Sequence, residues 1–152
     1  MNKIDNILKK YNWPTKVSVD DLDFTEIEHR IGFELPNDYK DFLRKYSFYE
    51  TQIGEESFKL WDFDKLLDWN IGYEIFDNLK MTIGIGDNGG GEFIGLEKFN
   101  DENIRVILTP FIDLDKEYHI EIGYSFTDFL TRMDNGKKWF KDNETEENNS
   151  NY

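Results

Sequence analysis

The sequence predicts an α+β protein in which helices pack against an antiparallel, meandering sheet. In residues 1–46, apolar residues recur at the i, i+3, i+4 and i+7 spacing of amphipathic helices. From about residue 50, short runs alternate apolar and polar residues between turn signals, and one last helical pattern follows residue 125. Because the helices and strands come in blocks instead of alternating, a parallel α/β fold is not expected.

Three helices are expected before residue 47. Asn2 is placed to cap the first helix, which ends at Trp13 and Pro14. The second opens at Asp20 or Asp21 and ends at Gly32, and Pro36 occupies the first position of the third. Their apolar faces contain Ile4, Ile7, Leu8 and Tyr11, then Phe24, Ile27 and Ile31, then Leu35, Tyr39, Phe42, Leu43 and Tyr46.

The strands are expected to follow one another as hairpins. One or two short strands lie within residues 52–61, and a turn of helix follows at residues 63–67. Residues 81–85 and 92–96 form a hairpin around a glycine-rich turn. Further strands are expected at residues 104–108, stopped by Thr109 and Pro110, and at residues 119–123. Ser125 then caps the closing helix in an S-x-x-D capping box with Asp128.

The length of 152 residues fits a single domain, which we expect at residues 1–141. Residues 142–152 contain four acids and no base, and we expect them to be a disordered acidic tail. The chain has no cysteine, no apolar run long enough to span a membrane, and no signal-peptide pattern at its start. These features predict a cytoplasmic protein that folds without disulfides.

The net charge of −14 is concentrated within the expected domain. Residues 46–104 hold 13 acids and four bases, a net charge of −9. Such a surface repels nucleic acid and anionic membranes, and it attracts basic proteins. The alternative is that the acidity only keeps the protein soluble.

The motifs that would indicate an enzyme or a cofactor site are weak. Residues 84–89 match G-x-G-x-x-G, but a strand follows where a dinucleotide site needs a helix. Residues 113–117 resemble the start of a calcium loop, but its sixth and twelfth positions are Tyr118 and Tyr124. His29 and His119 stand apart from any metal or catalytic spacing, and no G-x-S-x-G motif is present. We therefore expect no cofactor, no metal site and no enzymatic activity.

Acids interleaved with aromatic residues predict a protein-binding site instead, because aromatic anchors and complementary charges are typical of interfaces. The alternative for Trp61 and Trp69 is a place in the core. The predicted partner-binding residues are Glu50, Glu55, Glu56, Trp61, Asp62 and Asp64, with Asp87, Glu92, Asp113 and Asp115 as secondary candidates.

Three segments resemble the SUKH superfamily, the group that includes the yeast cell-wall synthesis regulators. Residues 31–43 (IGFELPNDYKDFL) are similar to its N-terminal motif, in which a helix ends at a small residue before Leu-Pro and a second helix. Residues 85–92 (IGDNGGGE) are similar to its glycine-rich hairpin, and residues 125–130 (SFTDFL) to its closing helix. The chain departs from the family pattern at residues 46–49, where YSFY replaces a frequent Asn-Gly.

The resemblance implies an α+β fold and, for bacterial members, an immunity role. Such proteins bind and neutralise toxins, often nucleases, by obstruction, and they have no catalytic residues to carry over. A basic protein toxin is then the expected partner, and the chain is expected to be a monomer or a weak homodimer. The alternatives are a regulatory or scaffold module and a small-ligand binder, which would need a well-formed apolar pocket.

Overall fold

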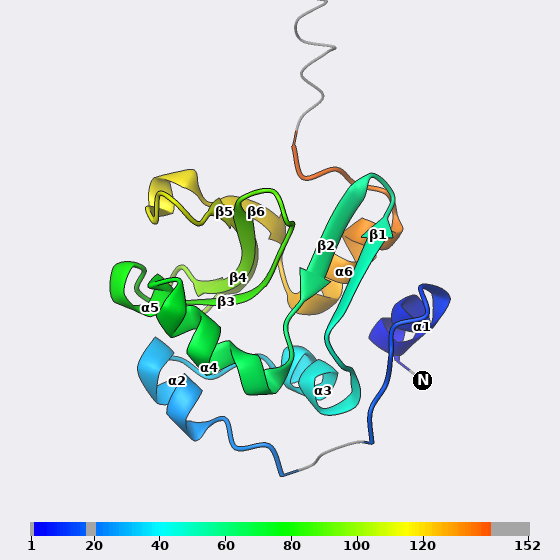
Figure 1. Ribbon diagram of the computed structural model, residues 1–152, viewed down its shortest axis with the longest axis horizontal. Coiled ribbons are helices and arrows are strands. Elements are labelled where there is room, and N and C mark those ends of the chain that lie inside the picture. The colour runs from blue at the N-terminus through cyan, green and yellow to red at the C-terminus, as the bar shows by residue number, and fades with distance from the viewer. Residues whose placement is uncertain (1, 18–20, 141–152) are drawn as a thin grey trace, which may run out of the picture.

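The computed structural model describes residues 2–17 and 21–140, and within them six strands form one antiparallel sheet in the order β1-β2-β3-β4-β5-β6 (Figure 1). The strands are β1 (Tyr49–Ile53), β2 (Glu56–Leu60), β3 (Thr82–Asp87), β4 (Glu92–Lys98), β5 (Ile104–Pro110) and β6 (Ile120–Gly123). The helices are α1 (Lys3–Lys10), α2 (Thr25–Ile31), α3 (Asn37–Lys45), α4 (Phe63–Gly72), α5 (Ile75–Asn78) and α6 (Phe126–Asp134), with a 3-10 turn η1 (Lys116–Tyr118). The predicted α+β class with a meandering sheet is confirmed. The tail predicted at residues 142–152 lies outside the described residues.

The helix ends described here agree with the predicted ones except at the starts of α2 and α3. Asn2 accepts the N–H of Asp5, and Gly32 ends α2 in the left-handed conformation with φ 84°. The start predicted for α2 was wrong, because the helix begins at Thr25, whose N–H is bonded by the Asp23 carboxylate. Pro36 is the N-cap of α3 and not its first residue, because its ψ of 145° is extended.

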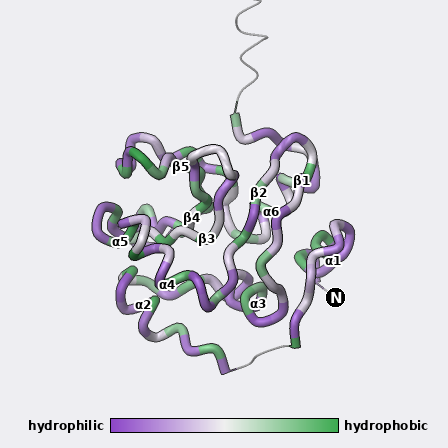
Figure 2. The backbone as a smooth tube through the Cα atoms, viewed as in Figure 1, coloured by the Kyte–Doolittle hydropathy of each residue, from purple (hydrophilic) through white to green (hydrophobic). Residues whose placement is uncertain are grey.

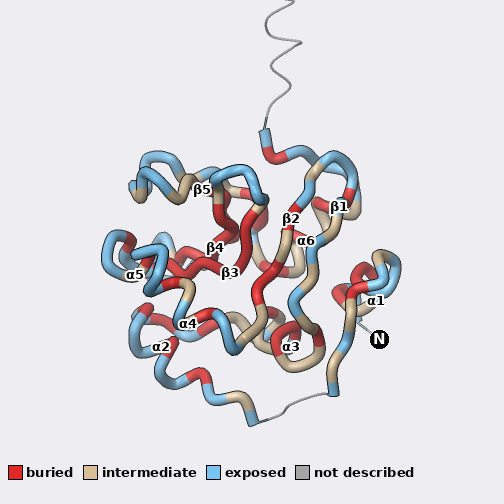
Figure 3. Tube along the Cα trace, viewed as in Figure 1, coloured by how far each residue is buried: buried red, intermediate tan, exposed pale blue. Residues whose placement is uncertain are grey.

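Both faces of the sheet are covered, because successive side chains of β3 point to opposite faces and all six residues are buried. Ile83 and Ile94 point to the face that packs on α3 and α6, where Phe126 contacts Tyr39 with ring centroids 5.1 Å apart. The opposite face meets α4 and α5, and there Gly84 leaves room for the side chains of α4 and α5. Figure 3 shows that β3, β4 and β5 are buried along most of their length. The core therefore extends through the sheet, and the helices surround it.

The helices are amphipathic, as Figure 2 shows from the alternation of hydrophobic and hydrophilic stretches along them. On α1 the buried residues are Ile4, Ile7 and Leu8, which form the stripe predicted from their spacing. In the described ranges, no helix combines the length and apolarity that a bilayer crossing requires.

The end predicted for β5 was wrong. β5 continues through Thr109 to Pro110, because the neighbouring strand pairs with both residues, at Phe93 and Glu92. A proline is tolerated at a strand end, where its missing N–H breaks no internal ladder bond. β2 pairs with β3 only at its end, at Lys59 with Asp87 and Leu60 with Gly86, since α4 and α5 are inserted between these strands.

Candidate protein-binding site

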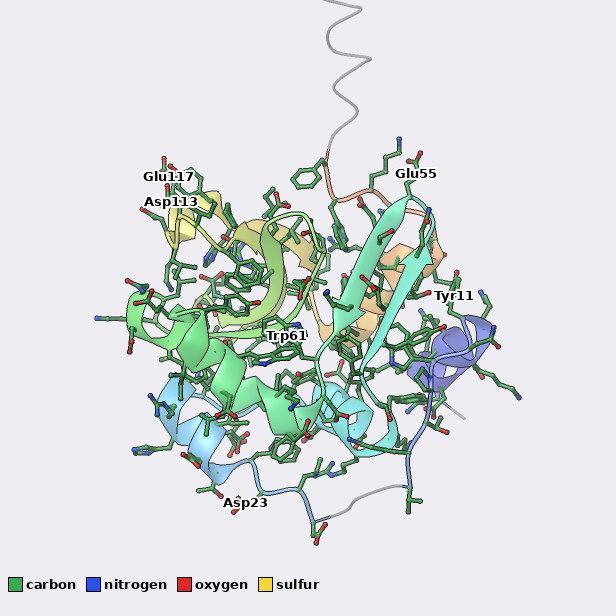
Figure 4. The ribbon with its side chains drawn as sticks, in the orientation of Figure 1. Tyr11, Asp23, Glu55, Trp61, Asp113 and Glu117 are labelled. Carbon is green, nitrogen blue, oxygen red and sulfur yellow. The ribbon has the colours of Figure 1, made fainter. Side chains whose placement is uncertain are left out.

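Three connections between strands leave the sheet at the same end, which we call the turn end. They are the β1–β2 turn (residues 54–55), the glycine-rich β3–β4 turn (residues 88–91) and the β5–β6 loop (residues 111–119). Successive antiparallel pairing places alternate connections together. In Figure 4, Glu55 lies on one side of this end, and Asp113 and Glu117 lie on the other. Most of the predicted binding carboxylates lie at or beside the turn end.

The β1–β2 hairpin carries three of the predicted carboxylates in different settings. Glu55 is exposed, with Oε2 2.9 Å from Lys138 Nζ. Glu56 is half-buried, and its Oε2 accepts the N–H of Trp139 at 2.8 Å. Glu50 is exposed at the far end of β1. Glu55 is therefore accessible at the surface, whereas Glu56 holds the segment that follows α6.

Trp61 and Asp87 form a buried pair beneath the turn end. Trp61 is 1% exposed, and its Nε1–H donates to Asp87 Oδ2 at 3.0 Å. The other Asp87 oxygen accepts the N–H of Gly89 at 2.9 Å and lies 3.7 Å from Lys59 Nζ. In this structure Trp61 is an interior side chain, as the alternative from the sequence had it. Any part that Trp61 has in binding is therefore indirect.

Asp62 and Asp64 lie where β2 joins α4, away from the turn end. Asp62 caps α4 by accepting the N–H of Phe63 at 2.8 Å, and it pairs with Lys16 Nζ at 2.8 Å. Asp64 is exposed in the first turn of that helix, where its negative charge interacts favourably with the helix dipole. The structure thus divides the acids around residues 50–64 between two regions of the surface.

The glycine-rich turn shapes a hairpin. Asn88 Oδ1 accepts the N–H groups of Gly90 and Glu92, and Asn88 Nδ2 donates to the Glu92 carboxylate at 2.8 Å. Gly89 and Gly91 have φ of 72° and 100°, which other residues rarely adopt. The strand β4 follows directly, so this G-x-G-x-x-G string lacks the helix that would face a phosphate.

The β5–β6 loop presents the last two predicted acids, Asp113 and Asp115, and both are exposed. Asp115 Oδ1 accepts the N–H of Glu117 at 2.9 Å and so caps η1. Over residues 2–17 and 21–140, no three His, Cys, Asp or Glu side chains are grouped as a metal site would need. These acids therefore act as surface charges and as loop caps.

A buried ionic cluster on β4 escaped the sequence analysis. Glu97 is 2% exposed, and its carboxylate lies 2.9 Å from Arg105 Nε, 3.4 Å from Lys116 Nζ and 3.3 Å from His119 Nδ1. Burial raises the pKa of Glu97, but interactions with His119 and Arg105 outweigh burial and lower the pKa to about 2. The signal was a charge two and four residues after the interior residues Gly95 and Phe93, on the same face of β4.

Two adjoining pockets of about 270 and 450 Å³ lie between α1 and α3, away from the turn end. Both are lined by Asp5, Lys45 and Tyr46. The Tyr46 hydroxyl donates to Asp5, which also lies 3.6 Å from Lys45 Nζ. Burial raises the pKa of Asp5, but these partners together lower it below its usual value. The polar groups that line the pockets therefore bind one another, and these bonds connect α1 to the end of α3.

Sequence reasoning also missed exposed apolar side chains beside the turn end. Tyr73 follows α4 and Phe111 follows β5, and their ring centroids are 4.3 Å apart. Ile112 comes next and is 97% exposed. These residues lie in turns, where no periodic pattern marks them, and only the fold brings them together.

Comparison with known proteins identifies one family. The model of the SMI1 / KNR4 family (SUKH-1) matches residues 18–132. None of the curated proteins searched matches the chain. The matched segment runs from before α2 into α6, so it contains the whole sheet, whereas α1 precedes it.

Proposed function

The chain belongs to the SMI1/KNR4 family (SUKH-1), and from this premise we propose that it is an immunity protein that binds and neutralises a cognate toxin. The observation that carries the proposal is family membership together with a net charge of −14. A nuclease must present a basic surface to phosphates, so the acidic chain is suited to cover a nuclease. We accordingly propose a basic nuclease toxin as the partner.

The proposed mechanism is steric and electrostatic blockade, and it requires no catalytic residue and no cofactor. Exposed carboxylates such as Glu55 and Asp113 speed the encounter with a basic partner, and apolar contacts then set the lifetime of the complex. The proposed compartment is the cytoplasm, where an incoming nuclease would reach nucleic acid.

Co-expression tests the proposal. We would express the chain with the C-terminal domain of each toxin-like protein found to be encoded next to it, and score cell survival and co-purification. The expected result is rescue with a stable 1:1 complex. If no neighbouring toxin-like domain is neutralised or bound, immunity is excluded, and the regulatory or scaffold module becomes the better proposal.

Titration of purified components separates blockade from other forms of rescue. Nuclease activity should fall linearly with added chain and end at one equivalent, because tight binding consumes the toxin stoichiometrically. A toxin variant without nuclease activity should still bind. Rescue without binding to that variant would exclude blockade as the mechanism.

A further inference from the structure

Two exposed apolar side chains and a half-buried one lie at the α4–α5 junction and the start of the β5–β6 loop. Tyr73 is 47% exposed and Ile112 97% exposed, and Phe111 between them is half-buried. Single exposed apolar residues are common on protein surfaces, but a contiguous group rimmed by polar residues is typical of a binding surface.

The group rests on a rigid base. The Tyr73 ring stacks on the buried Trp61 ring, with centroids 6.1 Å apart and planes at 17°. Phe111 contacts the buried Phe93 at 5.2 Å, and its N–H donates to Gly91 O at 2.9 Å. A partner that binds here pays little conformational entropy, because the aromatic side chains are already held in place.

Acids outnumber bases around this group, although one of them, Asp87, is buried and paired with Lys59. Residues 73–77, 87–92 and 111–117 contain seven acids and one lysine. That lysine, Lys116, lies 3.4 Å from the buried Glu97, a carboxylate that also pairs with Arg105. Asp113 and Glu117 point outward from the loop together (Figure 4).

We propose that Tyr73, Phe111 and Ile112 form the apolar centre of the toxin-binding surface, and that the surrounding carboxylates select the partner. The partner is a protein face with an apolar depression ringed by lysine and arginine. Charge complementarity commits the surface to this occupant, because the exposed acids around it, among them Glu74, Asp113 and Glu117, would repel an acidic or phosphate-bearing one. This inference rests on the proposed immunity function and assigns its site.

The first test replaces the apolar centre. Ile112→Ser should raise the Kd for the catalytically inactivated toxin domain about tenfold, since an interface anchor is lost. Val17→Ser is the matched control, because Val17 is 89% exposed and lies outside the surface. Both variants should unfold at the wild-type temperature, because neither side chain is packed.

The second test reverses the rim charge. Asp113→Lys with Glu117→Lys should lower the association rate about tenfold at low ionic strength, and salt should narrow the difference. The control is Asp101→Lys with Glu102→Lys, which makes the same change in net charge at the β4–β5 turn, the other end of the sheet. Equal slowing by both pairs would mean that net charge alone acts, and it would overturn the proposed surface.

The wild-type chain separates the two proposals. If it binds no toxin domain, the immunity function fails, and the surface fails with it. If the wild-type chain binds and Ile112→Ser binds equally well, only the surface is wrong. Binding that is weakened by Ile112→Ser and unaffected by Val17→Ser supports both.

Discussion

The buried side-chain amide of Asn70 makes hydrogen bonds to the β3 backbone of the kind that a neighbouring strand would make. Its Oδ1 accepts the N–H of Gly84 at 2.6 Å, and its Nδ2 donates to the carbonyls of Gly84 and Leu66 at 2.9 and 2.8 Å. Gly84 lies where the β3–β4 register shifts, before β2 begins to pair with β3. The Asn70 amide therefore satisfies backbone groups that no neighbouring strand reaches.

Asn70→Ala should lower the free energy of unfolding by about 3 kcal/mol, because it leaves the buried N–H and C=O of Gly84 unsatisfied. Urea denaturation measures the change. Asn78→Ala is the control, because Asn78 makes the same bond to a carbonyl four residues earlier but is exposed. Equal losses in the two variants would contradict this role for Asn70.

Glu97 should make the protein sensitive to acid. Its folded pKa of about 2 lies below the unfolded value of 4.5, so the ionised carboxylate stabilises the folded state above pH 4.5. That contribution is lost as the pH falls toward 2, because protonation then costs the folded state its ion pairs. Glu97→Gln should lower the free energy of unfolding at pH 7 by about 2 kcal/mol. Between pH 4.5 and 2, the free energy of unfolding should then fall less steeply in the variant than in the wild type.

Denaturation curves across this pH range test the Glu97 prediction. Glu102→Gln is the control, because Glu102 is exposed at the β4–β5 turn. If the free energy of unfolding falls as steeply with pH in Glu97→Gln as in the wild type, the acid sensitivity belongs to other carboxylates. Asp5 and Asp134 are candidates, because their pKa values are also lowered.

At the scale of elements, β2 and β3 are joined by a short stretch of pairing, at Lys59 with Asp87 and Leu60 with Gly86. Gly86 sits at this junction, and a Cβ atom there would collide with the carbonyl oxygen of Lys59. Gly86→Ala should therefore part the two strands and destabilise the protein by about 3 kcal/mol. Gly90→Ala is the matched control, because its Cβ would make only ordinary contacts in the turn. Thermal unfolding should show a large loss for the first variant alone.

The sequence predicted the elements where hydrophobic period and turn chemistry agree. The caps at Asn2, Gly32 and Ser125 and the β3–β4 hairpin all depend on neighbours in the chain, so local patterns suffice. α4 was predicted only as a turn of helix, because its buried face includes the polar Asn70 and so breaks the apolar period. α5 was not predicted, since a four-residue helix gives no period.

At the scale of the whole molecule, salt should act oppositely on stability and on binding. A net charge of −14 repels itself in the compact state, so added sodium chloride should raise the free energy of unfolding by about 1 kcal/mol. The association rate with a basic partner should fall over the same range. Urea denaturation and stopped-flow mixing measure the two. A fall in both quantities would show that surface ion pairs outweigh the general repulsion.

The candidate site was only partly predictable. The antiparallel meander predicted from the sequence already places alternate turns together, so Glu55 and Asp113 are brought to one end of the sheet. The burial of each aromatic residue could not be predicted, because Trp61 and Tyr73 both stand among acids and apolar residues in the sequence. The structure separates them, with Trp61 inside and Tyr73 stacked above it at the surface.

The order of the strands also affects how the chain folds during synthesis. Each strand pairs with its neighbour in sequence, so the sheet grows by local steps, and the longest loop it closes is the β2–β3 connection that contains α4 and α5. The aromatic core differs, because Phe126 of the last helix must return to Tyr39 and Phe42 of α3. We therefore expect the sheet to assemble progressively during synthesis, whereas the packed core needs α6. The packed core is then complete only after α6 has been translated.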